Sequence, residues 1–232
     1  MTVVDRLVAL YHRLTPVLIC LCHSMALIGG FHSVVSRRIT ERFKEFMTLR
    51  GIFLLEVVCV KEAIRFVADL MCVAARTAPK AVGKDFVVTS VVQGDALLDL
   101  ANAMVEYGKT TGKKNYDRDG ANVAASSACV LIGLKDAKVC GLNCGACGHD
   151  KCVDLPELSD GPEFKGPVCT WRTIDMGIAL GSAVKVASMH NVDNRIIYRV
   201  GVLAKKMGLI DADVVIGIPL SASGKNIYFD RG

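Results

Sequence analysis

The chain has 232 residues, a formal net charge of +5 and 52% hydrophobic residues. This length is enough to bury one sizeable core, so we expect one domain with an appendage. The positive charges are dispersed and the chain contains one Trp, which argues against nucleic-acid binding because neither a strong basic patch nor an aromatic platform for stacking bases is present.

The N-terminal part holds an apolar stretch, PVLICLCHSMALIGGF, from Pro16 to Phe31. His23 and Ser24 interrupt it, and it is shorter than the roughly 20 residues that span a bilayer. We therefore predict no membrane span. We interpret residues 1–57 as an atypical extension that is not part of the fold, with Met47 as a second plausible start before the first regular helix.

Residues 58–232 are predicted to form a single mixed α/β domain, because helix and strand patterns alternate along them. The predicted helices are Cys59–Thr77, Gly94–Gly108, Thr173–His190 and Asn194–Gly208. The predicted strands are Asp85–Val92, Ser127–Leu134 and Ala212–Ser221, with Lys225–Asp230 as a last edge strand. A polar loop is expected between Gly108 and Ser127.

Cysteines gather in one segment of this domain. Five of the ten lie within 30 residues, in a loop at 138–170 that includes KVCGLNCGACGHDKC. The chain is far longer than the small secreted domains that disulfides stabilise. Clustered cysteines therefore indicate a metal centre in a reducing compartment, and we predict a cytoplasmic protein.

Four of these cysteines have the spacing C-x2-C-x4-C-x16-C: Cys144, Cys147, Cys152 and Cys169. A four-iron cluster needs four converging thiolates, usually three from one tight loop and one from a distance. Three glycines in the loop are expected to adopt positive φ and to direct N–H groups at the cluster sulfurs: Gly141, Gly145 and Gly148. Acidic residues beyond the trio are expected to lower the reduction potential: Asp154, Glu157, Asp160 and Glu163.

Zinc is the competing metal. Structural zinc sites usually pair two C-x2-C units, or cysteines with histidines, whereas this segment has one such unit. The spacing therefore favours an iron–sulfur cluster over zinc, with disulfides behind both. Cys140 also lies near the trio, and we expect it to be a small buried residue at a strand end.

The segment from Cys144 to Cys169 resembles the four-iron domain of Rnf-type B subunits and of the corrinoid iron–sulfur protein. Residues 62–231 more broadly resemble the ferredoxin-domain (4Fe-4S domain-containing) proteins of anaerobic bacteria and archaea. The resemblance rests on AARTAPKAVGKD, DRDGANV, GLNCGACG, ALGSAVKVASMHNVDNRI and GIPLSASGKNIYFD. It implies a [4Fe-4S] cluster on the four cysteines and does not supply a reaction.

Two loops, AARTAPKAVGKD and IGIPLSASGKN, are also similar to loops that hold the FMN phosphate in flavin-binding nitroreductases. The resemblance implies a nitroreductase-like fold with FMN as a second cofactor. Arg76, Lys80 and Lys225 would then contact the flavin phosphate. The early arginine cluster of those enzymes is not evident in this chain.

Two functions remain open at this point. The chain is either an electron carrier or small oxidoreductase, or a binding or regulatory module in which the cluster is a structural staple. A redox role predicts cluster ligands near the surface, where electrons enter and leave. The expected partners are a redox protein or a small-molecule substrate, with a homodimer as a candidate assembly.

Overall fold

The computed structural model describes residues 60–229. A helix covers residues 60–77. The other elements follow in the order η1 (Ala81–Gly83), β1 (Val87–Val92), α3 (Asp95–Thr111), α4 (Tyr116–Ala124), β2 (Ala128–Leu134), η2 (Cys152–Asp154), β3 (Ser159–Asp160), β4 (Lys165–Gly166), α5 (Thr170–Met189), β5 (Asp193–Asn194), α6 (Tyr198–Lys206) and β6 (Val214–Ser221). The predicted mixed α/β fold is confirmed. The prediction for residues 1–57 lies outside the described residues.

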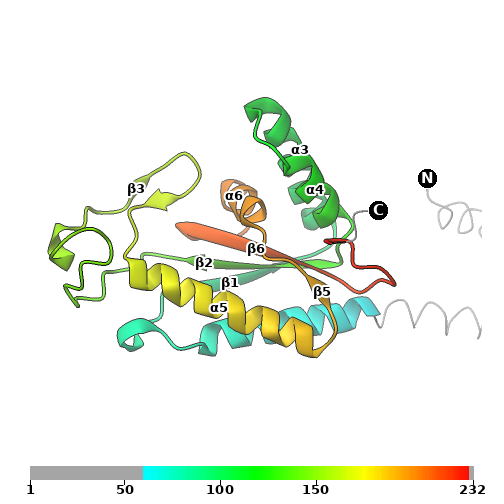
Figure 1. Cartoon of the computed structure of the whole chain (residues 1–232). Helices are drawn as coiled ribbons and strands as arrows, with labels where there is room; N and C mark the ends of the chain where they lie inside the picture. The colour runs from blue at the N-terminus through cyan, green and yellow to red at the C-terminus, as the bar shows by residue number, and fades with distance from the viewer. Residues whose placement is uncertain (1–59, 230–232) are drawn as a thin grey trace, which may run out of the picture. The chain divides into compact units, whose positions relative to one another are not determined.

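One antiparallel sheet of four strands forms the centre, in the order β1-β2-β6-β5. At one end of this sheet Val87 pairs with Leu134, which in turn pairs with Val214. At the opposite end Asp193 pairs with Ser221. The short strands β3 and β4 form a separate hairpin, which lies beyond the main sheet on the same side as the cysteine loop (Figure 1).

Helices cover both faces of the sheet, and each face has its own apolar cluster. The helix at 60–77 and α5 lie on one face, and α3, α4 and α6 lie on the other (Figure 1). Strand β2 is buried along its whole length because alternate side chains enter the two clusters, Ile132 in one and Leu131 in the other. Full burial of such a side chain stabilises the fold by about 1.5–3 kcal/mol.

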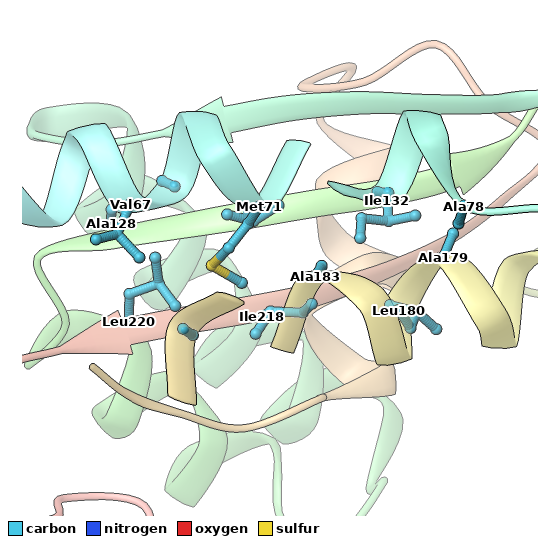
Figure 2. Close-up of a cluster of buried hydrophobic side chains, with 14 of the residues drawn as sticks. Val67, Met71, Ala78, Ala128, Ile132, Ala179, Leu180, Ala183, Ile218 and Leu220 are labelled. Atoms are coloured by element: carbon cyan, nitrogen blue, oxygen red, sulfur yellow. The ribbon is translucent and has the colours of Figure 1, made fainter. Parts of the chain in front are cut away.

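The first of these clusters fixes the position of α5. Figure 2 shows Met71 of the helix at 60–77 and Ala183 of α5 directed at Ile132 and Ile218 of the sheet. Small residues on α5, including Ala179 and Ala183, are completely buried and let this helix lie close to the strands. The N-terminus of α5, where Cys169 is located, is thereby held at the end of β2 from which the cysteine loop departs.

The structure corrects three sequence predictions. Helix α4 forms where a polar loop was expected, and α3 continues through Gly108 to Thr111. Tyr116 of α4 packs on Gly108, where an added Cβ would lie 2.7 Å from the Tyr116 Cβ. Residues 225–229 form turns rather than the predicted edge strand. None of the helices between residues 60 and 229 has the length and hydropathy of a membrane span.

Candidate metal centre

The cysteine loop connects the end of β2 to the start of α5. Cys144 and Cys147 lie in its irregular first half, Cys152 begins η2, and Cys169 is the residue immediately before α5. These four thiols and that of Cys140 line a single pocket, with about 300 Å³ of space free of protein atoms, part of it open to solvent. The loop and the helix start thus bring all the predicted ligands to one place.

Exposure differs among these cysteines. Cys144 is exposed, Cys147 and Cys152 are half-buried, and Cys169 is buried, at 6% exposure. Cys140 is half-buried on the pocket wall. It lies well beyond the end of β2, so the expectation of a buried residue at a strand end was wrong. One side of the pocket therefore faces solvent and the other faces the core.

The backbone of the loop is shaped for close approach to a ligand. Gly141, Gly145 and Gly148 have φ values of 79°, 72° and 87°, which confirms the predicted positive φ. Asn143 also has a positive φ, 47°, a conformation that asparagine tolerates better than most residues. Its N–H donates to the Cys152 Sγ at 3.3 Å, and its Oδ1 accepts from the Cys152 N–H at 2.9 Å. Asn143 thus fixes the position of Cys152, a role that sequence reasoning missed.

The start of α5 is attached to the same loop by two side chains. Trp171 donates its Nε1–H to the Cys144 Sγ at 3.1 Å, and Thr170 donates its hydroxyl to the Ala146 carbonyl at 3.0 Å. The Ala146 N–H and then the Trp171 indole lower the pKa of the Cys144 thiol below its ordinary value, because both donors stabilise the thiolate. Sequence reasoning did not identify Trp171, since the residue is 27 positions away from Cys144.

Cys169 lies at the N-terminus of a 20-residue helix. Burial raises the pKa of its thiol, but backbone N–H groups of Cys140, Trp171 and Arg172 lower it by more, so that the net pKa is below the ordinary value. Donors at a helix N-terminus favour a thiolate in this way. The chain therefore stabilises the charged form that a metal ligand requires even at the buried ligand.

Four cysteines on one pocket match the number of thiolates that a four-iron cluster needs. A zinc ion bound by four thiolates at about 2.3 Å would hold the sulfurs only about 3.8 Å apart. Within residues 60–229, no three Cys, His, Asp or Glu side chains are grouped closely enough to share one ion. In a four-iron cluster each thiolate binds a different iron, so the ligand sulfurs surround a wider cage. Four cysteines line one pocket, and N–H groups donate to the sulfurs of three of them, Cys144, Cys152 and Cys169.

The three cations expected to hold a flavin phosphate are not brought together. Arg76 donates to the Val87 carbonyl at 2.6 Å and pairs with Asp85, while Lys80 donates to the carbonyls of Ala75 and Arg76. Both therefore lie near the end of the sheet where β1 begins. Lys225 follows β6 at the opposite end. Within one chain the eight-residue strand β6 separates the two loops, and a flavin phosphate at these residues stays a prediction.

A second sequence motif, MHNVDNRI, runs from the end of α5 toward α6. Asp and Asn are residue types that often cap a following helix, and Asn191 and Asp193 lie before α6. Helix α6 instead starts at Tyr198 and has no side-chain cap. The Asp193 carboxylate accepts from the Asn226 side chain at 2.9 Å, so this motif attaches the C-terminal segment to β5.

Comparison with known proteins identifies the family. A family model described as "Uncharacterized protein containing a ferredoxin domain (DUF2148)" matches residues 165–231. An uncharacterized protein of Archaeoglobus fulgidus is 47% identical over 171 residues, which is 73% of this chain and 92% of that protein. The chain belongs to this ferredoxin-domain family. The family match begins just before Cys169 and includes α5, α6 and β6.

Several solved structures are distantly similar in fold. Nitroreductase A from Vibrio parahaemolyticus is 12% identical, with a TM-score of 0.43, over 69% of this chain and 59% of its own. A nitroreductase with bound FMN from Desulfitobacterium hafniense is 12% identical, with a TM-score of 0.44, over 68% of this chain and 78% of that protein. A nitroreductase family protein from Clostridium novyi is 19% identical, with a TM-score of 0.44, over 70% of this chain and 78% of that protein. The chain thus spans about three fifths of the first of these proteins, and such distant similarity indicates nothing about its ligands or activity.

Proposed function

We propose that this ferredoxin-domain protein transfers electrons through one [4Fe-4S] cluster held by Cys144, Cys147, Cys152 and Cys169. The observation that carries the proposal is the convergence of these four thiols on one pocket whose Cys144 side is exposed. The spacing of the ligands, which resembles that of four-iron domains in Rnf-type B subunits, supports the same cluster type. When bound, such a cluster supplies one-electron transfer.

Surrounding residues act on the charge at the ligands. The N–H groups of Asn143 and Trp171 donate to sulfur and favour a more negative site, which raises the reduction potential. Exposed carboxylates of Asp154, Glu157 and Asp160 oppose added negative charge and lower it. The fourth predicted acid, Glu163, is paired with Lys113 and contributes little to that effect.

The alternative is a purely structural cluster, which would hold in place the long segment between Cys152 and Cys169 by binding both of its ends. That segment has other attachments, however. Glu163 accepts from Tyr107 and Tyr116, and the Lys165 N–H donates to the Asp213 carbonyl at 3.1 Å. A staple also permits deep burial, whereas Cys144 is exposed. These observations favour the redox function.

The test is anaerobic purification of the full chain followed by iron and sulfide analysis and a reductive titration monitored by EPR. We expect about four irons and four sulfides per chain, and reversible reduction by dithionite or reduced ferredoxin. Cys152→Ser should abolish the EPR signal, while Cys72→Ser, a matched change at a half-buried cysteine away from the pocket, should leave it. Zinc without iron, or an intact cluster that resists reduction, would overturn the proposal.

The redox partner can be identified with a probe that the chain already contains. Trp171 is its only tryptophan, is 36% exposed and donates to the exposed ligand Cys144. A redox protein that docks over Cys144 should therefore change the Trp171 fluorescence. A titration with oxidised ferredoxin that leaves this emission unchanged would exclude ferredoxin as a partner at this face.

A further inference from the structure

A completely buried arginine directly follows the three residues at the start of α5 that line the cysteine pocket, Cys169, Thr170 and Trp171. Arg172 has 0% exposure and follows the buried ligand Cys169 by less than one helical turn. Its Nε donates to the Lys138 carbonyl at 2.8 Å, two residues before Cys140. Cys140 and Cys169 both line the pocket, so the guanidinium is attached to two segments of the pocket wall.

The same guanidinium also organises the loop around η1. Its Nη1 donates to the carbonyls of Ala81 at 2.9 Å and Lys84 at 3.1 Å, and to the Asp175 Oδ2 at 3.0 Å. The other Asp175 oxygen accepts from the Ala81 N–H at 2.7 Å. Arg172 thus joins three segments that are far apart in the sequence: the η1 loop, the start of the cysteine loop and α5.

A buried ion pair of this kind is an expensive way to hold segments together. The free energy needed to remove two charges from water can exceed what their attraction returns. Replacement of a buried ion pair by apolar side chains of similar volume is therefore often neutral or stabilising. The Phe86 ring, 4.8 Å from the guanidinium carbon, already provides an apolar neighbour. A charged pair at this position therefore suggests a role for the charge itself.

One donor of Arg172 has no acceptor. Across residues 60–229, Nη2 is the sole buried side-chain nitrogen or oxygen without a hydrogen-bond partner. Buried polar groups in native proteins are nearly always satisfied, and an exception calls for an explanation such as a missing ligand. The donors of this guanidinium that have partners contact the η1 loop, Lys138 and Asp175. Lys138 lies two residues before Cys140, which lines the pocket.

We propose that Arg172 and Asp175 set the reduction potential of the cluster, with Arg172 as a positioning residue whose Nη2 donates to sulfur when the site is loaded. This inference rests on the proposed electron-transfer function. A positive charge in a low-dielectric environment behind the ligands stabilises the more negative, reduced site, and Asp175 offsets part of that charge. The two charges therefore shift the reduction potential in opposite directions. Arg172 raises it and Asp175 lowers it.

A purely structural role would predict something different. If Arg172 only joined three segments, its replacement would loosen the site and speed iron loss without moving the potential of the protein that remains loaded. The chain offers a matched control in Asp119, which is 1% exposed and pairs with Arg118 and Arg199 on the opposite face of the sheet. Asp119→Asn removes the same kind of buried charge far from the pocket.

The experiment measures midpoint potential by EPR-monitored titration, together with iron content, for full-length loaded protein and three variants. Arg172→Met should shift the potential to more negative values and Asp175→Asn to more positive values. Each shift should reach a tenfold change in the ratio of reduced to oxidised protein at fixed potential, which is about 59 mV for one electron. Arg172→Lys should keep the potential near that of the natural protein but lose iron faster, because an ammonium cannot reach all the carbonyls that the planar fork binds.

Asp119→Asn should leave the potential unchanged even where it lowers the unfolding temperature. Equal potentials for the natural protein, Arg172→Met and Asp175→Asn at full iron content would overturn the inference while leaving the electron-transfer function intact. Shifts of the same sign in both variants would also overturn it. If Arg172→Met fails to hold iron, the midpoint potentials of Asp175→Asn and Asp119→Asn decide the question. A positive shift in Asp175→Asn alone supports the inference, and equal potentials in the two variants overturn it. A natural protein that cannot be reduced would overturn the proposed function itself.

Discussion

Glu163 offers a direct test of what holds the cysteine loop closed. Its Oε1 accepts from the hydroxyls of Tyr107 and Tyr116, each at 3.3 Å, and from Lys113. The side chain is 11% exposed, so its replacement by Ala would leave both hydroxyls without this acceptor. Each tyrosine bond contributes about 1 kcal/mol, and the half-exposed Lys113 pair adds at most about 1 kcal/mol. We therefore expect Glu163→Ala to weaken attachment of the β3–β4 hairpin by about 2–3 kcal/mol.

The consequence should be faster loss of iron, because the hairpin lies between the ligands Cys152 and Cys169. With every 1.4 kcal/mol equal to a factor of ten, transfer of iron to a chelator under anaerobic conditions should accelerate by about 30- to 140-fold. The control is Glu157→Ala, an exposed acid on the same loop, which should change the rate by no more than about twofold. A Glu163→Ala protein that releases iron at the natural rate would refute this account of the loop.

Four further substitutions have defined outcomes. Gly201→Ala should destabilise the fold by about 3 kcal/mol in urea unfolding, because the new Cβ would lie 1.8 Å from the Val215 carbonyl oxygen. Gly181→Ala, where the Cβ meets nothing within 4 Å, should instead stabilise by about 0.5–1 kcal/mol, and equal effects would contradict the packing of α6 on β6. Trp171→Phe should lower the midpoint potential because it removes the N–H donor to Cys144 and keeps an aromatic ring, and an unchanged potential would show that this bond has no influence. Burial raises the pKa of the Cys129 thiol from 9.0 to about 12, so above pH 9 the unfolded chain loses a proton that the folded chain keeps, and stability falls as pH rises. Between pH 9 and 10 the free energy of unfolding should fall by about 1 kcal/mol for this reason. Cys129→Ala should lack this pH-dependent loss, although its smaller side chain lowers the stability by a constant amount at every pH.

The parts of the fold that the sequence predicted well are those whose signals are local. Strand β2 is an uninterrupted apolar run, and α5 has buried alanines at helical spacing, so both were found with errors of a few residues at their ends. Helix α4 was missed because its sequence, YDRDGANVA, is mostly polar. Two of its residues are buried in tertiary contacts, Asp119 with Arg199 and Gly120 against α3, and no local pattern reveals such partners.

The candidate site divides in the same way. The three clustered cysteines and the glycines with positive φ lie within a dozen residues, so local spacing was enough to predict the positive φ values and the grouping of these cysteines. Glu163 was grouped with the acids expected to lower the reduction potential, since its partners Tyr107, Lys113 and Tyr116 lie about 50 residues earlier. The flavin-phosphate residues stay a prediction, because the two loops that resemble a known motif lie at opposite ends of the sheet within one chain.

This division has a chemical consequence for the proposed cluster. Which cofactor binds is determined by thiolate number and spacing, which are local properties of the loop. How strongly the site favours an added electron depends on charges and donors that tertiary structure brings in, from Trp171 at 27 residues from Cys144 to the η1 carbonyls at about 90 residues from Arg172. Relatives that keep the same four cysteines can therefore differ widely in potential when these distant contacts change. The buried pair of Arg172 and Asp175 is the contact at which such a difference should be largest, because its charges are the least screened by solvent.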